Sequence, residues 1–212
     1  MELFGENSGK SFKDIPFAAV AAEAHQCKKC PLHKGRTNVV FGHGPVPCDL
    51  MLIGEAPGAD EDAQGLPFVG RSGQLLTNIL ESVGIKRDTD IYIANTVKCR
   101  PPENRAPNNE EITACFPYLE AQIHHVKPKI ILLAGAPAVK TIIASDEPMG
   151  KLRGKWIKYK DGITVMPIFH PAYLLRNQSR AVGSPKWHTW QDMKEIINAV
   201  NFYRQARELK VQ

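Results

Sequence analysis

The 212-residue chain lacks the features that would place it in a membrane or on a secretory route. No apolar run approaches the ~18 residues that a membrane-spanning helix needs. The N-terminus, MELFGENSGK, lacks the basic and then apolar pattern of a secretory signal. Internal repeats and low-complexity linkers are also missing. We therefore expect one cytoplasmic domain over residues 1–212, without membrane association and with residues 1–13 as a loose N-terminal segment.

The composition is that of an ordinary globular domain. Apolar residues make up 43% of the chain and charged residues 23%, both typical values. Lysine and arginine outnumber the acids, which gives a net charge of +5. This modest excess suits a polyanionic partner but does not by itself indicate one.

Apolar runs that alternate with segments of helical periodicity set the expected fold. Four runs are typical of buried strands, at residues 49–53, 91–95, 130–134 and 163–168. Helices are expected around and between them, at residues 14–26, 75–83, 109–125, 135–143 and 186–209. Residues 151–160 are expected to form a hairpin with the last strand. This order predicts an α/β protein, a three-layer α/β/α domain with a mostly parallel four-stranded central sheet.

The loop after the first predicted strand, residues 54–73, has the sequence GEAPGADEDAQGLPFVGRSG. Ligands of open α/β sheets bind beyond the carboxyl ends of the strands, where this loop is expected. Its glycines fit neither the dinucleotide pattern nor the P-loop, and its acids disfavour a free phosphate. Glu55, Asn95 and His170 each end a predicted strand, so we expect the three side chains to converge.

Four of the five cysteines form a pattern of C-x2-C, then 68 residues, then C-x15-C. In a reducing compartment, where disulfides are not expected, four such thiolates suit a [4Fe–4S] cluster or structural zinc. A zinc ribbon would usually bring a second C-x2-C, which is missing. Unrelated buried thiols are the remaining alternative, because free cysteine is often a small core residue. Cys48, outside the pattern, is expected to be such a core thiol.

Four segments of the chain resemble the family-4 uracil-DNA glycosylases in sequence and in order: CKKCPLHKGRT, GEAPGADEDAQGLPFVGRSGQLL, NTVKCRPPENRAPNNEEITAC and HPAYLLR. The resemblance spans about residues 15–205. It implies excision of uracil from DNA after base flipping, which leaves an abasic site. It also implies a [4Fe–4S] cluster, with a mainly structural role, on Cys27, Cys30, Cys99 and Cys115. We expect a monomer whose partner is uracil-containing DNA.

The implied chemistry gives the three strand-end residues roles. Breaking an N-glycosidic bond builds positive charge on the sugar and negative charge on the base. Glu55 is the candidate for the sugar side, and a neutral His170 is the candidate donor to uracil O2. Asn95 can pair with uracil N3–H and O4, whereas cytosine would be mispaired. The alternatives are a carboxylate that caps the turn, a structural histidine and a turn asparagine.

Other residues of the same segments are candidates for the pocket wall. Phe68 could stack on the extruded base, or it could be a simple core contact. The backbone at Ala56 and Pro57 is expected to line the uracil. Glu61 and Asp62 could bound the pocket near the uracil 5-position, although solvated loop acids are the simpler interpretation.

The candidate contacts to DNA come from two segments. The HPAYLLR segment offers a wedge or prop, with Tyr173, Leu174, Leu175 and Arg176 as candidates. The densest basic run offers phosphate contacts, with Lys151, Arg153, Lys155, Lys158 and Lys160 as candidates. Core packing of the first set and a solvated hairpin face for the second are the alternatives.

Two other functions fit parts of this pattern. The first is that of a family-5 enzyme of the same superfamily, which would be expected to lack the acid that Glu55 supplies. The second is a non-catalytic iron–sulfur DNA-binding module of the same fold. The presence of Glu55 argues against the first, and the presence of Glu55, Asn95 and His170 together argues against the second.

Overall fold

The structure is a computed structural model of the chain and describes residues 15–209. The predicted loose segment, residues 1–13, lies outside the described residues. Within residues 15–209, no helix is long and apolar enough to cross a membrane.

A five-stranded sheet with the order β2-β1-β3-β5-β4 forms the centre of the domain. The four predicted strands are confirmed and run parallel, as β1 (Leu50–Gly54), β2 (Tyr92–Asn95), β3 (Ile130–Ala134) and β5 (Thr164–Ile168). The fifth strand, β4 (Ile157–Lys158), pairs antiparallel with β5 and corrects the predicted number of four. Two residues at a half-exposed edge are too few to produce a strand pattern in the sequence. The predicted hairpin is thus confirmed only at this pairing.

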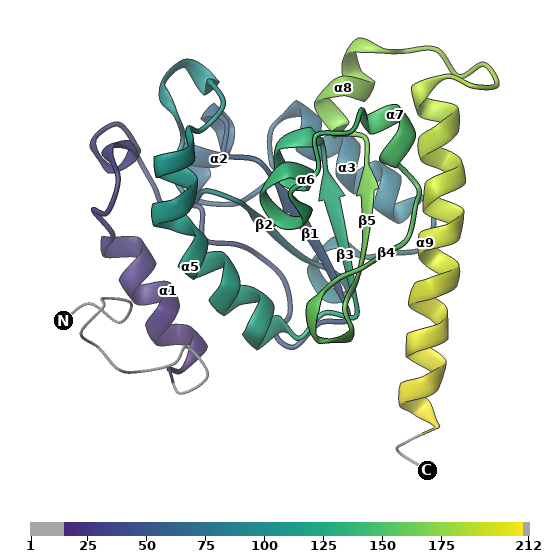
Figure 1. Ribbon diagram of the computed structural model, residues 1–212, viewed down its shortest axis with the longest axis horizontal. Coiled ribbons are helices and arrows are strands. Elements are labelled where there is room, and N and C mark those ends of the chain that lie inside the picture. The colour runs from purple at the N-terminus through teal and green to yellow at the C-terminus, as the bar shows by residue number, and fades with distance from the viewer. Residues whose placement is uncertain (1–14, 210–212) are drawn as a thin grey trace.

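Helices cover both faces of the sheet, as Figure 1 shows. One face packs against α5 (Asn109–Val126), α6 (Ala136–Ile143) and α7 (Met149–Leu152). The other packs against α3 (Arg71–Glu81) and α9 (Pro185–Glu208). Successive strand residues alternate between the faces: Leu50 and Leu52 belong to one core cluster, and Met51 and Ile53 to the other. The predicted three-layer α/β/α architecture is confirmed.

A third apolar cluster lies beside this sandwich and contains Cys99 and Cys115. It joins α1 (Phe17–Gln26), which packs on α5, to the 3-10 helix η1 (Pro31–Lys34). The start of α5 is fixed by a capping box at Asn108. Asn108 Oδ1 accepts from Glu111 N, and the Glu111 carboxylate accepts from Asn108 N, each at 2.9 Å.

The sequence did not predict several short helices in the connecting loops. They are α2 (Ala59–Gln64), α4 (Arg87–Asp90), α8 (Pro171–Arg176) and the 3-10 helices η2 (Pro102–Asn104) and η3 (Lys160–Gly162). Six residues or fewer give less than two turns, so no apolar periodicity can develop. Both α2 and α8 follow parallel strands and therefore shape the edge of the sheet where the predicted site lies.

Candidate active site

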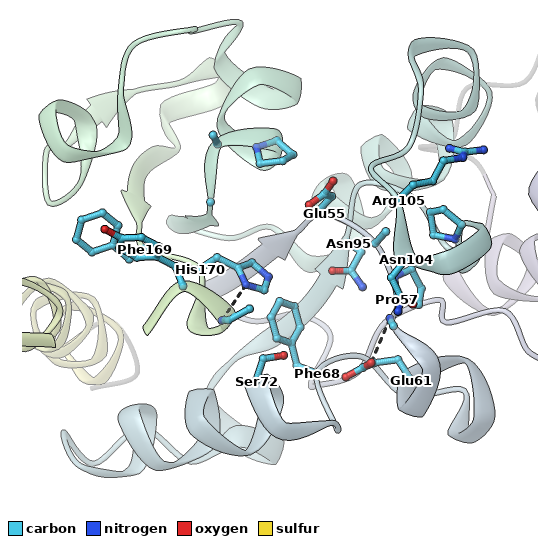
Figure 2. A pocket seen from close by; sticks show the side chains of 18 of the residues that line it. Glu55, Pro57, Glu61, Phe68, Ser72, Asn95, Asn104, Arg105, Phe169 and His170 are labelled. Atoms are coloured by element: carbon cyan, nitrogen blue, oxygen red, sulfur yellow. Dashed lines mark hydrogen bonds between the residues drawn. The ribbon is translucent and has the colours of Figure 1, made fainter. Parts of the chain in front are cut away.

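A cavity of about 920 Å³ lies beyond the carboxyl ends of the four parallel strands (Figure 2). Each strand contributes to its lining: Glu55 follows β1, Asn95 ends β2, Gly135 follows β3 and His170 follows β5. Because parallel strands end at the same edge of a sheet, their terminal side chains meet there. The predicted convergence of Glu55, Asn95 and His170 on one cavity is therefore confirmed.

Asn95 presents a buried amide to this cavity. The residue is 2% exposed. Its Oδ1 is the one buried side-chain nitrogen or oxygen without a hydrogen-bond partner in the described part of the chain. A Cβ atom added to Gly54, on the paired strand, would lie 2.5 Å from Oδ1, so glycine is needed beneath the amide. Leaving a buried acceptor unpaired costs roughly 1–3 kcal/mol. Such a cost is expected at a site that a hydrogen-bond donor enters.

A buried lysine, which the sequence analysis did not single out, holds the backbone of Asn95. Lys98 is 2% exposed, and its Nζ donates to the Asn95 carbonyl at 2.7 Å and to Gln122 Oε1. Burial lowers the pKa of Lys98 to about 8. Gln122 Nε2 in turn donates to the Phe41 carbonyl at 2.6 Å. This buried network ties the end of β2 to α5 and fixes where the amide stands.

His170 is a neutral hydrogen-bond donor at the N-terminus of α8. Its Nδ1 accepts from the Ala172 backbone N–H at 3.1 Å, so the ring proton is on Nε2. Burial and the charge of Arg176 lower the pKa of His170 to about 4. At neutral pH the imidazole is therefore uncharged, and its Nε2–H is left to donate into the cavity that the ring lines.

Glu55 is half-buried, and burial raises the pKa of its carboxyl. Within residues 15–209, no hydrogen bond or ion pair reaches its carboxylate. The turn that follows β1 is held instead by backbone contacts, because the Glu55 carbonyl accepts from Thr96 Oγ1 at 2.6 Å and from Val97 N at 3.2 Å. The alternative that this carboxylate caps the turn is therefore wrong. Figure 2 shows the side chain among the residues that line the cavity.

Phe68 forms an aromatic wall opposite these groups. It is 6% exposed, and its ring lies over Gly54 and 5.7 Å from the His170 ring, centroid to centroid. Its φ of +51° is unusual for a residue with a side chain. The loop is held from two sides, because a Cβ at Gly73 would lie 2.0 Å from the Phe68 carbonyl and Arg87 donates to the Pro67 carbonyl. Residues held in such rare backbone conformations are typical of active sites and ligand-binding segments.

The two loop acids, Glu61 and Asp62, are buried, whereas the simpler interpretation of the sequence was that they are solvated. Glu61 is buried and lines the cavity, and its carboxylate accepts from the backbone N–H groups of Gly58, Val69 and Gly70 at 2.8–3.1 Å. Asp62 is 4% exposed and accepts from Thr37 N at 2.9 Å, away from the cavity. The interpretation of solvated acids is wrong for both, because each carboxylate is buried and accepts hydrogen bonds from backbone N–H groups.

The predicted contacts to DNA divide into two groups. Tyr173 and Arg176 are exposed and line the cavity, as Ala56 and Pro57 also do. Leu174, on the same helix, is 1% exposed, so the expectation that it acts as a wedge is wrong.

In the basic run, Lys151 and Lys155 are exposed but do not line the cavity. Arg153 is folded inward, where it forms an ion pair with Asp192 and donates from Nε at 2.8 Å. Its predicted role as a phosphate contact is therefore wrong, because its guanidinium is already paired inside the protein.

The structure adds polar residues to the cavity that the sequence analysis missed. Ser72 of α3 and Asn104 and Arg105 of the loop after β2 all line it. Glu111 accepts two hydrogen bonds from the Arg105 guanidinium, at 2.7 and 2.9 Å, and so holds it at the cavity. The repeated arginines of the loop were the available signal, but only the fold shows which of them faces the cavity.

The four patterned cysteines line one small cavity between α1, the segment 97–99 and α5. Backbone or guanidinium N–H groups donate to three of the sulfur atoms: Lys29 N to Cys27 at 3.5 Å, Lys98 N to Cys115 at 3.3 Å, and Arg36 to Cys99 at 3.2 Å. Within residues 15–209, no three His, Cys, Asp or Glu side chains form a group that could hold a metal ion. Cys48 is a buried thiol that donates to the Leu50 carbonyl, as expected of a core residue.

Comparison with known proteins identifies the family. The family model "Uracil DNA glycosylase superfamily" matches residues 41–194. A type-4 uracil-DNA glycosylase of Thermotoga maritima is 47% identical over 161 residues, which cover 76% of this chain and 83% of that protein. A type-4 uracil-DNA glycosylase of Pyrobaculum aerophilum is 45% identical over 159 residues, 71% of this chain and 80% of that protein.

A type-5 enzyme from the same Pyrobaculum species separates the two branches. It is only 27% identical over 152 residues, which cover 65% of this chain and 67% of that protein. Its lower identity places this chain with the type-4 enzymes rather than with the family-5 alternative. The chain therefore belongs to the uracil DNA glycosylase superfamily, and within it to the type-4 uracil-DNA glycosylases.

Proposed function

We propose that this protein flips uracil out of DNA and hydrolyses its N-glycosidic bond, leaving an abasic site. The observation that carries the proposal is the buried, unpaired Oδ1 of Asn95. Uracil presents a donor at N3 and an acceptor at O4, which match the acceptor and the two donors of a carboxamide. Cytosine presents the reverse at these two positions, so a fixed amide would be left mispaired with it.

His170 and Glu55 stabilise the two charges that develop when the bond breaks. When the bond between the sugar C1′ and uracil N1 breaks, its electron pair leaves with the base. The His170 Nε2–H donates to uracil O2, where part of that charge collects, without giving up its proton. The ionised Glu55 carboxylate stabilises the cationic sugar and orients the water whose oxygen bonds to C1′. That water loses its proton to Glu55 and then to solvent.

The base is held between these groups by the cavity walls. Phe68 stacks on the extruded uracil, and the backbone at Ala56 and Pro57 lines its edge. Glu61 keeps the loop closed near the uracil 5-position through its three backbone hydrogen bonds. Tyr173 and Arg176 on one helix, and Arg105 on the opposite loop, contact the DNA around the extruded nucleotide. Lys151 and Lys155 are proposed as more distant phosphate contacts.

Cys27, Cys30, Cys99 and Cys115 would hold a [4Fe–4S] cluster. Burial raises the pKa values of Cys30 and Cys99, and that of Cys115 to about 12, so these thiols need a bound cation to ionise. The four sulfurs surround a shared cavity, and three of them receive N–H hydrogen bonds, which suits a multi-iron cluster. Once bound, the iron charge would stabilise the thiolates and cross-link α1, the loop after β2 and α5.

An oligonucleotide assay tests the proposed function. Duplexes and single strands that carry one uracil, cytosine or thymine are incubated with the protein in chelator, and abasic sites are revealed by alkali. We expect abasic product from uracil DNA only, with no strand break before alkali and with far less product from Glu55→Gln. DNA binding without abasic product would favour the non-catalytic module instead. Gel filtration and cell fractionation test the expected monomer and the expected cytoplasmic location.

A further inference from the structure

A second groove lies next to the candidate active site and has no role in the chemistry described above. It has a volume of about 470 Å³ and is formed by α3, α8, Arg180 of the loop after α8 and the N-terminal part of α9. Its floor is apolar, and its walls carry two of the three tryptophans of the chain, Trp187 and Trp190. Because these residues are three apart on α9, both side chains lie on the same side of the helix.

The groove neighbours the cavity where uracil is proposed to bind, and residues of α3 and α8 line both. On α3, Ser72 lines the cavity and Leu75 lines the groove, and three residues along a helix span only about 5 Å. On α8, consecutive residues divide in the same way, since Tyr173 lines the cavity and Leu174 the groove. Figure 1 shows α8 and the start of α9 at the end of the domain to which the parallel strands point. A strand of DNA that leaves the cavity over α8 therefore reaches the groove.

The charge of the groove suits the backbone of such a strand. Arg180 and Lys186 lie at its rim, and the described residues that line it include no carboxylate. Lys186 Nζ is held by Gln178 Oε1 at 2.6 Å. The other large groove, between α5 and α6, differs in this respect, because Asp146 and Glu147 line it.

The exposed tryptophan gives the groove a surface for a base. Trp190 is 46% exposed although it borders an apolar floor. Successive bases of single-stranded DNA stack on aromatic side chains while cationic side chains follow the phosphates. The bases of an intact duplex are stacked on one another and cannot enter. An aromatic groove with a cationic rim therefore favours an unpaired strand.

We propose that this groove binds an unpaired nucleotide of the DNA strand that flanks the uracil. The proposal rests on the proposed function, because that function places the strand over α8. It identifies single-stranded DNA as a preferred form of the substrate. Trp190 stacks on the base, and Arg180 and Lys186 contact the adjoining phosphates.

Binding to uracil-free DNA tests the groove without any chemistry. Affinities for a labelled single strand and for a hairpin duplex of the same sequence are measured by fluorescence anisotropy. We expect Trp190→Ala to weaken single-strand binding roughly 5- to 100-fold, with partial rescue in Trp190→Phe, and to weaken duplex binding by a smaller factor. Trp156→Ala is the matched control, because Trp156 is 38% exposed but lies outside the groove. It should bind both forms as the wild type does.

Tryptophan fluorescence places the strand independently. A Trp156→Phe variant keeps only the two groove tryptophans, so a single strand should quench its emission more than the hairpin does. Unchanged single-strand affinity in Trp190→Ala, or equal losses on single strand and duplex, would overturn the proposal. Absence of uracil excision by the wild type would instead refute the proposed function, and the binding measurements would still report on the groove.

Discussion

The substitution Asn95→Leu separates the two consequences of an unpaired buried amide. Leucine has nearly the same shape as asparagine but no hydrogen-bonding atoms. In the free protein, Asn95 Oδ1 has no partner among the described residues, so its removal abolishes a desolvation cost of roughly 1–3 kcal/mol. For a chain of this size each kcal/mol shifts the melting temperature by about 2–4 °C. We therefore expect Asn95→Leu to melt at a higher temperature than the wild type.

The same substitution should nearly abolish excision of uracil. With leucine in place, uracil N3–H and O4 enter a buried site without partners. A loss of hydrogen-bond pairing between a buried site and its substrate lowers kcat/KM by about 10⁴-fold. We therefore expect kcat/KM for uracil excision to fall by about that factor. Calorimetry and single-turnover excision of uracil from one oligonucleotide measure the two effects on the same preparation.

A matched control uses an asparagine whose amide is satisfied. Asn38 Nδ2 donates to the carbonyls of Asp62 and Ala63, at 2.8 and 3.1 Å, outside the cavity. Asn38→Leu should therefore destabilise the fold, by about 1–3 kcal/mol. A loss of stability in Asn95→Leu comparable to that of Asn38→Leu would refute the reasoning, because it would mean that the amide is already paired in the free protein.

Three further predictions concern ionisation and the cysteines. Burial raises the pKa of Glu55, so the charge of its carboxylate opposes folding above that pKa. Glu55→Gln should therefore stabilise the protein at pH 7, and the gain in stability should shrink towards low pH. The same substitution should lower kcat at least 10²-fold. Equal stability at pH 7 would contradict this. The folded protein lowers the pKa of His170 from 6.5 to about 4, so acid favours the unfolded state, which binds this proton more readily. The contribution of the neutral ring to the free energy of unfolding, up to about 3 kcal/mol, is present above pH 6.5 and is lost as the pH falls through 4. Urea unfolding of His170→Gln should show a weaker acid dependence between these values than the wild type, and identical curves would refute it. Purified protein should be brown and contain about four iron atoms, and Cys115→Ser should lose both; a colourless wild type with stoichiometric zinc would exclude the cluster.

The sequence predicted the parallel strands well because each is buried on both faces. Ile130–Ala134 is apolar at every position, and the structure gives it the predicted limits. The convergence of Glu55, Asn95 and His170 followed from topology, since parallel strands end at one edge. By contrast, β4 and the helices α2, α4 and α8 are too short to produce a periodic pattern.

The errors at the site arise from partners that are distant in sequence. Arg153 is 39 residues from Asp192, and its ion pair exists only because α7 packs beside α9. Glu61 meets backbone donors in a loop that no pattern describes. The orphan Oδ1 of Asn95 and the tautomer of His170 likewise depend on neighbours at ångström distances. Sequence patterns indicate which residues reach the site, whereas their hydrogen-bond states require the structure.

The central claim is that the Asn95 amide reads uracil, and the ratio of uracil to cytosine excision tests it most directly. Single-turnover rates are measured on oligonucleotides that differ only in the target base, for the wild type and for Asn95→Asp. An ionised aspartate cannot donate to uracil O4, and a protonated one can donate to cytosine N3. The expected result is a ratio of about 10⁴ or more for the wild type that falls sharply in Asn95→Asp. An unchanged ratio in the variant would contradict the claim.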